Sequence, residues 1–182
     1  MNDLLLLSLL LEAPQHGYAL KKKAGLIFGL PDMHNNLVYP LLRRFVDQGW
    51  VRQKAAAGKR GQRRLMYSLT PAGHREIVRR ICQFGDTDAR SAEAFHLRVG
   101  LFELLAPPAR TQILQKRLDH LVKKDTLFAK LEAEMDLGRY GGEVVGHLRE
   151  LARAEVRWIE RLRRIDSARR PKSKAQWGGR SQ

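Results

Sequence analysis

Two short runs of polar and cationic side chains carry the clearest chemistry in this sequence. The first comprises Asn35, Asn36, Tyr39 and Arg43, and the second comprises Lys59, Arg60, Arg63 and Arg64. Asparagine can pair with adenine, and arginine with guanine, through two hydrogen bonds each, and clustered cations neutralise phosphates. The two runs therefore predict a surface that binds a nucleic-acid duplex.

Each run also has a simpler interpretation. Asn35 and Asn36 can cap a helix, because an asparagine oxygen accepts hydrogen bonds from the first free N–H groups. A run of cations is usually a solvated surface, but this one lies with Gly58 and Gly61 at the predicted tip of a hairpin, which favours contact with phosphates or a minor groove. Both interpretations of the asparagines stay open. Lys21 and Lys22 are further candidates for phosphate contact.

The apolar periodicity around these runs predicts the elements that must position them. We expect helices over residues 1–13, 16–28 and 35–48. Two strands around the basic loop and a fourth helix, which Thr70 caps and Pro71 begins, complete the segment. Helix, helix, turn, helix and hairpin is the order of a winged helix-turn-helix domain, in which the third helix enters the major groove.

The expected core positions of these helices follow the same spacing. They are Tyr18, Leu20, Ala24 and Ile27 on the second helix, Val38, Leu41, Leu42 and Phe45 on the third, and Ile77, Val78 and Ile81 on the fourth. With its apolar face in the core, the third helix leaves the four residues of the first polar run pointing away from it.

The second half of the chain predicts a helical domain. After a polar junction at residues 85–91, helices are expected over residues 92–105, 108–137 and 142–165. The expected fold class is mainly α with a small β-hairpin wing. It comprises a winged helix-turn-helix domain at residues 1–85 and a C-terminal α-helical domain at residues 86–166.

Apolar residues on the last two expected helices recur at steps of three, four and seven, which favours an antiparallel helical hairpin. On the last helix this seam comprises Leu148, Leu151, Trp158, Leu162 and Ile165. Asp125 and Glu155 interrupt the two apolar seams, so the pattern is not that of an unbroken coiled coil. Beyond the hairpin, residues 167–182 carry five cations and little apolar content, and we expect this tail to be disordered.

The charge balance narrows the class of partner. The chain has 34 basic and 19 acidic residues and a formal net charge of +15, which favours polyanions such as nucleic acid or an anionic membrane surface. Residues 1–85 carry +9, residues 86–166 carry +1 and residues 167–182 carry +5. The first segment therefore suits a polyanion, and the nearly neutral second segment suits another copy of the chain.

Several classes of protein are excluded. A single cysteine, Cys82, forms no internal disulfide and supplies no multi-thiolate zinc site. The longest apolar stretch, Leu4–Leu11, has eight residues and is too short to span a membrane. The six histidines lack metal-ligand spacing, and no Ser/His/Asp arrangement or phosphate-binding glycine loop stands out. We expect a cytoplasmic protein without metal or cofactor that is not an enzyme.

Four short motifs follow one another between residues 4 and 75. They are His16-Gly17-Tyr18, Val38-Tyr39-Pro40-x-Leu42, Gly49-Trp50-Val51 and Tyr67-Ser68-Leu69-Thr70-x-x-Gly73. Together they resemble the PadR family of bacterial transcriptional regulators, and the helical second half is similar in layout to the family's larger members. The resemblance implies a DNA-contacting role for Tyr39. It also implies dimerisation through the C-terminal helices, here through Leu148, Leu151, Trp158, Leu162 and Ile165.

The leading hypothesis is a homodimeric transcriptional regulator, a repressor by resemblance, that binds a palindromic operator in double-stranded DNA. A small apolar or aromatic effector is a further expectation, with Phe95, Phe102 and Trp158 as candidate sensors, although plain core is the simpler interpretation of each. Two alternatives are a protein-interaction adaptor and a sequence-independent nucleic-acid-binding protein. The basic wing disfavours the first, and the basic tail is the best argument for the second.

Overall fold

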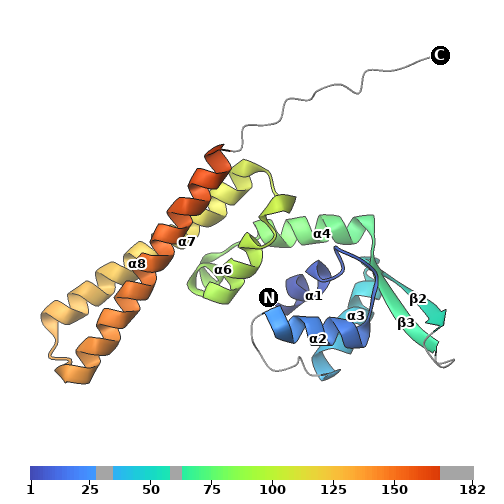
Figure 1. Ribbon diagram of the computed structural model, residues 1–182, viewed down its shortest axis with the longest axis horizontal. Coiled ribbons are helices and arrows are strands. Elements are labelled where there is room, and N and C mark those ends of the chain that lie inside the picture. The colour runs from blue at the N-terminus through green and yellow to red at the C-terminus, as the bar shows by residue number, and fades with distance from the viewer. Residues whose placement is uncertain (28–34, 58–62, 169–182) are drawn as a thin grey trace, which may run out of the picture. The chain divides into compact units, whose positions relative to one another are not determined.

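The computed structural model describes residues 1–27, 35–57 and 63–168, and the chain divides into two compact units, Met1–Ala106 and Pro107–Gln182. The first unit contains α1 (Asn2–Ser8), β1 (Gln15–His16), α2 (Gly17–Ile27), α3 (Asn35–Asp47), β2 (Val51–Ala57), β3 (Arg63–Leu69), α4 (Pro71–Cys82), α5 (Asp86–Arg90), α6 (Ala92–Val99) and the 3-10 helix η2 (Phe102–Leu104). The second contains α7 (Pro107–Glu134) and α8 (Gly138–Ala168). The predicted fold class, mainly α with a small β wing, is confirmed (Figure 1). Within the described ranges no helix is both long enough and apolar enough to cross a membrane.

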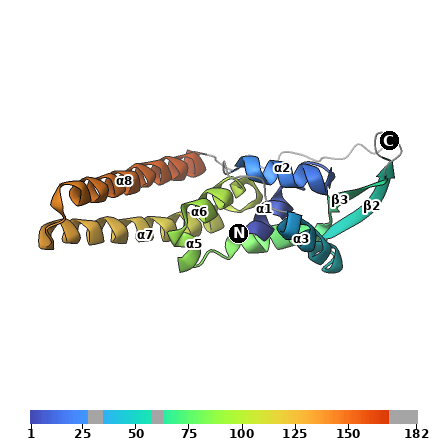
Figure 2. The ribbon, with the colours of Figure 1, turned by 90° about the horizontal axis from the view of Figure 1, so that it is seen from below.

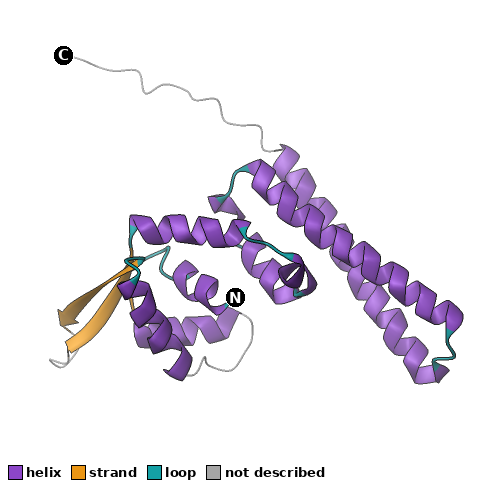
Figure 3. Ribbon diagram, turned by 180° about the vertical axis from the view of Figure 1, so that it is seen from behind, coloured by secondary structure: helices purple, strands orange, loops and turns teal. Residues whose placement is uncertain are grey.

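The core of the first unit is built from one face of each of its first four helices. Its buried members include Leu4, Leu5, Leu6 and Leu7 of α1, Leu20 and Ala24 of α2, Val38, Leu41, Leu42 and Phe45 of α3, and Ile77 and Ile81 of α4. The expected core face of α3 is therefore confirmed in full. Figure 3 shows the strands at one edge of this unit, where the helices leave them uncovered.

The end of α3 leads directly into the wing. Gly49 has a φ of 70°, the left-handed conformation that commonly ends a helix and that glycine adopts without strain. The N–H of Trp50 then donates to the carbonyl oxygen of Phe45 at 2.9 Å. Thr70 Oγ1 accepts from the N–H of Gly73 at 3.0 Å, so the predicted cap of α4 is present.

The sheet has three antiparallel strands in the order β1-β3-β2. The predicted hairpin pairs β2 with β3 from Val51↔Leu69 to Ala57↔Arg63. The third strand, β1, was not predicted from the sequence; it pairs Gln15 with Tyr67 and His16 with Met66. Two residues carry no alternation by which a strand can be recognised, yet this pairing holds the start of α2 beside β3.

Several expectations about the first unit are wrong in detail. Helix α1 ends at Ser8 rather than near residue 13, because the chain turns there and Gln15 Nε2 donates to the carbonyl oxygen of Leu9 at 2.8 Å. Tyr18 was expected in the core but is 65% exposed, since it lies in the first turn of α2 beyond the packed face. Val78 is also exposed, because only Ile77 and Ile81 of that face reach the core. The expected polar junction contains the short helix α5.

The first compact unit extends to Ala106, whereas we expected a domain boundary after residue 85. Arg98 explains part of the difference, because its buried guanidinium joins α6 to the end of α4 and to α5. It donates to the carbonyl oxygen of Gln83 at 3.0 Å and lies 3.2 Å from Asp88 Oδ2. The rings of Phe84 and Phe95 add a contact at a centroid distance of 6.1 Å.

The second unit is an antiparallel hairpin of α7 and α8, as predicted (Figure 2). Its buried apolar side chains are Ile113, Leu114 and Leu121 of α7 and Ala152 and Ile159 of α8. The seam expected for α8 was partly wrong, because Leu151 and Ile165 are 53% and 58% exposed. Leu151, Trp158 and Ile165 recur every seven residues and share one side of α8, whereas the side that faces α7 carries Ala152 and Ile159, about 100° further around the axis.

The residues that interrupt the apolar seams are paired across the hairpin. Arg117, which is 4% exposed, donates through Nε and Nη2 to the two carboxylate oxygens of Glu155 at 2.8 and 2.7 Å. Arg149 Nε donates to Asp125 Oδ1 at 2.9 Å, and this hydrogen bond lowers the pKa of Asp125. Ion pairs across the hairpin, of which Arg117–Glu155 is bidentate, fix the register of the two helices, because any slip leaves a charge unpaired in the seam.

Replacing Glu155 by Gln is expected to lower the free energy of unfolding by about 3 kcal/mol, because the Arg117 guanidinium then stays buried without its counter-charge. Urea denaturation followed by circular dichroism measures the effect. The matched control is Glu134→Gln, which breaks an exposed pair with Lys130 at 3.7 Å and is expected to change stability by less than about 1 kcal/mol. Equal effects of the two substitutions would contradict the assignment.

Candidate nucleic-acid interface

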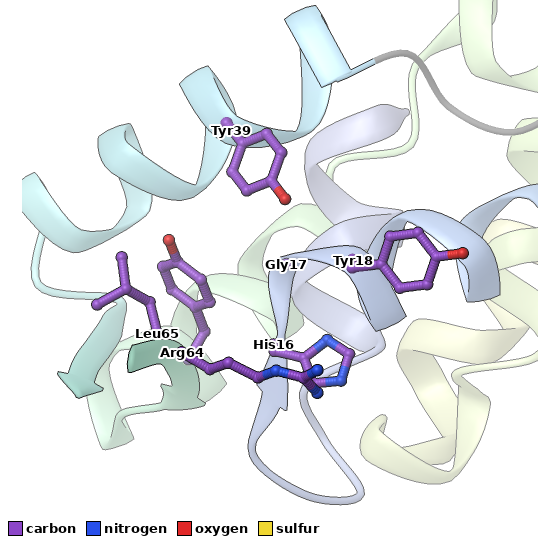
Figure 4. Close-up of a pocket in the computed structure, with 7 residues that line it drawn as sticks. His16, Gly17, Tyr18, Tyr39, Arg64 and Leu65 are labelled. Carbon is purple, nitrogen blue, oxygen red and sulfur yellow. The ribbon is translucent and has the colours of Figure 1, made fainter. Parts of the chain in front are cut away.

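A surface cavity of about 370 Å³ lies where the start of α2, the middle of α3 and the strand β3 meet (Figure 4). It is lined by His16, Gly17, Tyr18, Tyr39, Arg64, Leu65 and Tyr67. Two predicted site residues from different runs, Tyr39 of α3 and Arg64 of the wing, therefore share one cavity. Among the described residues that line it, none is acidic.

Tyr39 is held against the backbone of α2. A Cβ added to Gly17 would lie 2.7 Å from Cε1 of Tyr39, closer than carbon atoms approach one another. Glycine at position 17 thus lets the ring lie over the helix start, while 40% of the Tyr39 surface stays exposed. Figure 4 shows the Tyr39 hydroxyl directed toward Gly17, with the Arg64 side chain extending along the cavity toward His16.

The cavity is electropositive for two reasons. Arg64 contributes a guanidinium from an exposed position on β3. The N-terminus of α2 contributes the partial positive charge of its free N–H groups, and no acidic residue stands in its first turn. His16 caps this end, since its Nδ1 accepts from the N–H of Ala19 at 3.0 Å. Such a helix start beside an arginine is a favourable place for a phosphate.

Tyr67 forms the buried floor of the cavity at 4% exposure. Burial raises the pKa of its hydroxyl and the neighbouring Tyr39 raises it further, while Arg43 opposes the shift. Tyr67 therefore keeps its proton at neutral pH and remains a hydrogen-bond donor. Together with Tyr39 it gives the cavity two hydroxyl groups from two elements.

The outward face of α3 continues the surface beside the cavity. Asn36 and Arg43 are exposed, as the core-facing pattern predicted. Asn35 is the first residue of α3, but its side chain lies outside the described residues. Arg44, by contrast, donates to the Asp3 carboxylate of α1.

The other predicted contacts divide between described and undescribed positions. Lys22 is exposed on α2 and Lys21 is half-buried, whereas Lys23 lies 3.7 Å from Glu12 Oε2. Arg63 pairs with Ala57 in the hairpin, but its side chain lies outside the described residues. Lys59 and Arg60 also lie outside the described residues, as does most of the predicted tail.

His16, Gly17 and Tyr67 line the cavity but were expected only as motif residues and not as members of a site. The strand β1, which was not predicted, is what brings these residues together. Its pairing with β3 places the motif at His16 beside the motif at Tyr67. Leu65, 44% exposed on the wing, was also missed.

The remaining candidate sites have ordinary surroundings. Phe95 is fully buried, with its ring 6.1 Å from that of Phe84, and Phe102 is also buried, so both fill the core of the first unit. Among the described residues no three His, Cys, Asp or Glu side chains gather as metal ligands. Cys82 is exposed at the end of α4.

Comparison with proteins of known structure gives several relatives. A PadR family transcriptional regulator from Eggerthella lenta is 34% identical over 45% of this chain and 70% of its own, with a TM-score of 0.40. A transcriptional regulator from Clostridium thermocellum is 25% identical over 43% and 76%, with a TM-score of 0.40. Bacillus subtilis PadR, solved in complex with operator DNA, is 18% identical over 91% and 98%, with a TM-score of 0.45. No curated protein sequence matches the chain.

The sequence model described as the Transcriptional regulator PadR-like family matches residues 6–79. This segment begins in α1 and ends in α4, so it contains the cavity, α3 and the wing. With the identity to the Eggerthella lenta regulator, the match leads to one conclusion: the chain belongs to the PadR-like family of transcriptional regulators.

Proposed function

We propose that this protein is a transcriptional repressor that binds a palindromic operator in double-stranded DNA as a homodimer. The observation that carries the proposal is the cavity in which Tyr39, Arg64 and the start of α2 converge beside the exposed face of α3. In this proposal residues 1–85 bind DNA, and residues 86–166 supply the dimer contact.

The geometry supports two kinds of contact with the duplex, one to the bases and one to the phosphate backbone. With α3 in the major groove, Asn36 and Arg43 face base edges, where each can form a bidentate pair. A backbone phosphate then occupies the cavity, where it accepts from the Tyr39 hydroxyl and the Arg64 guanidinium. The phosphate fixes the register of the protein on DNA, and the bases supply specificity.

A second apolar stripe on α8 supports the dimer. Val144, Leu151 and Ile165 are each more than half exposed, and half-buried Trp158 stands in the same series at seven-residue spacing. Repeated exposed apolar residues on one helix face are the pattern of an interface with another helix. A second copy of the chain suits this face because its segment is almost neutral. Leu148 and Leu162, by contrast, are half-buried in the same helix.

Release from DNA by a small apolar or aromatic effector, and a cytoplasmic location, remain predictions within this proposal. An effector would act by shifting the population of dimers whose two α3 helices match successive major grooves, about one helical turn apart.

Selection of bound sites from random duplex DNA tests the function as a whole. We expect an enriched palindrome whose half-sites are separated by about one helical turn. Binding without enrichment would favour the sequence-independent alternative, for which the +5 charge of residues 167–182 is the main argument. No salt-dependent binding to any duplex would remove the proposal and favour the adaptor alternative.

Gly17→Ala is expected to weaken operator binding about tenfold while changing the free energy of unfolding by less than about 1 kcal/mol. The new methyl group displaces the Tyr39 ring, which is the flexible end of a side chain and can move at little cost. Fluorescence anisotropy and thermal melting measure the two quantities. Gly100→Ala, whose nearest neighbours lie 3.6 Å away, is the control and should leave both unchanged.

Arg64→Gln is expected to lower the magnitude of the salt dependence of operator binding by about one unit of log K against log salt per subunit, because one phosphate contact is lost. The unmutated protein should lose about 10³–10⁵-fold in affinity between about 50 and 200 mM salt if six to ten phosphates are neutralised per dimer. Arg90→Gln, an exposed arginine of α5, serves as the matched control. An unchanged slope for Arg64→Gln would show that the cavity holds no phosphate.

Leu151→Glu and Trp158→Ala are expected to shift the protein toward a monomer, since the first places a charge in the α8 stripe and the second removes its largest side chain. Sedimentation at micromolar concentration reports the change. Leu127→Glu, an equally exposed position on α7 outside the stripe, is the control and should leave the dimer intact. A stable monomer of the unmutated protein would refute the proposed assembly.

A further inference from the structure

Asp3 in the first turn of α1 joins three helices of the first unit through one carboxylate. Arg44 of α3 donates to its Oδ2, and Arg80 of α4 donates to the same oxygen at 2.9 Å. The carboxylate is only 23% exposed, and it also faces the positive end of its own helix. No motif or charge pattern in the sequence marked this residue.

The network continues on the far side of Arg80. Its Nε donates to Glu76 Oε1 at 2.6 Å, and its guanidinium lies 5.1 Å from the centroid of the Trp50 ring. Arg79 adds two hydrogen bonds to Glu76, which lower the pKa of that carboxyl more than any other contact. Arg80 is therefore fixed on several sides, so that Asp3 ties Arg44 to a rigid part of α4.

This contact lies at one edge of the exposed face of α3. Because successive residues of a helix turn by about 100°, Tyr39 and Arg44 leave the axis about 140° apart, with Asn36 and Arg43 between them. Tyr39 packs on Gly17 at one edge, and Arg44 binds Asp3 at the other. The buried face alone allows α3 to roll slightly in the core, whereas contacts at both edges prevent it.

The contact with Asp3 also neutralises the charge of Arg44. Arg44 is half exposed and stands next to Arg43 on a helix that would lie against DNA. A free guanidinium there would bind phosphates of any sequence. Bound to Asp3, its charge is balanced and its donors are directed toward α1.

We propose that Asp3 is a positioning residue for operator recognition: it sets the rotation of α3 about its axis and keeps Arg44 from DNA phosphates. The inference rests on the proposed function, since it presumes that α3 reads DNA. It goes beyond that function in assigning part of the specificity to a residue of α1 that need not touch DNA at all.

The central test measures Asp3→Asn against both the selected operator and a random duplex. We expect operator affinity to fall about tenfold and random-duplex affinity to rise about twofold, so that the specificity ratio falls about twentyfold. The salt slope on random DNA should increase by up to about one unit per subunit as Arg44 becomes available. Partial unfolding cannot produce this result, because it lowers both affinities.

Three variants separate position from charge. Asp47→Asn removes the same charge from an exposed site on α3 and should raise both affinities. Asp3→Glu keeps the charge but moves the carboxylate, so it should weaken operator binding without strengthening random binding. In an Arg44→Gln background, Asp3→Asn should have a much smaller effect on the specificity ratio, as expected for residues that act through each other.

An unchanged specificity ratio for Asp3→Asn, or an equal fall of both affinities, would overturn the inference. So would a full additional loss in the Arg44→Gln background. Failure of the proposed function is distinguishable, because the unmutated protein would then select no operator. Thermal melting of each variant confirms that the compared proteins are folded at the assay temperature.

Discussion

The burial of one face of α3 is the constraint on which the rest of the first unit depends. Val38, Leu42 and Phe45 are completely buried, which leaves the polar side of the same helix no place but the surface. The chain then leaves α3 through Gly49 into the wing, so the basic strand β3 returns beside the exposed face. One apolar stripe thus decides both what forms the core and what can meet a duplex.

A helix buried along one face still needs its rotation fixed, and the structure does this with contacts of different chemistry. At one edge the Tyr39 ring packs on a glycine, and at the other Arg44 binds a carboxylate of α1. The second unit also uses charged pairs to fix its packing, because Arg117 and Glu155 pair within the hairpin seam. Apolar burial supplies most of the stability in both units, while charged pairs select one arrangement among several.

The distribution of charge also differs between the two units. The first 85 residues carry a net charge of +9 and present cations around the exposed face of α3. In the hairpin, by contrast, many charged side chains form ion pairs between α7 and α8. What the hairpin leaves exposed on α8 is apolar at seven-residue spacing. A basic surface suited to a polyanion and an almost neutral apolar stripe suited to a second copy of the chain fit the two roles of the proposed dimeric regulator.

Local patterns in the sequence determined the helices, the hairpin, the cap at Thr70 and the core face of α3, because each depends on neighbours within a few residues. They also identified the family through motifs that are short and ordered. The tertiary structure alone decided which motifs meet. The two-residue strand β1 brings Gly17 to Tyr39, the packing of α1 brings Asp3 to Arg44, and the packing of α8 on α7 buries Ile159 while Leu151 stays exposed. These outcomes depend on contacts between distant segments, whose geometry no local periodicity contains.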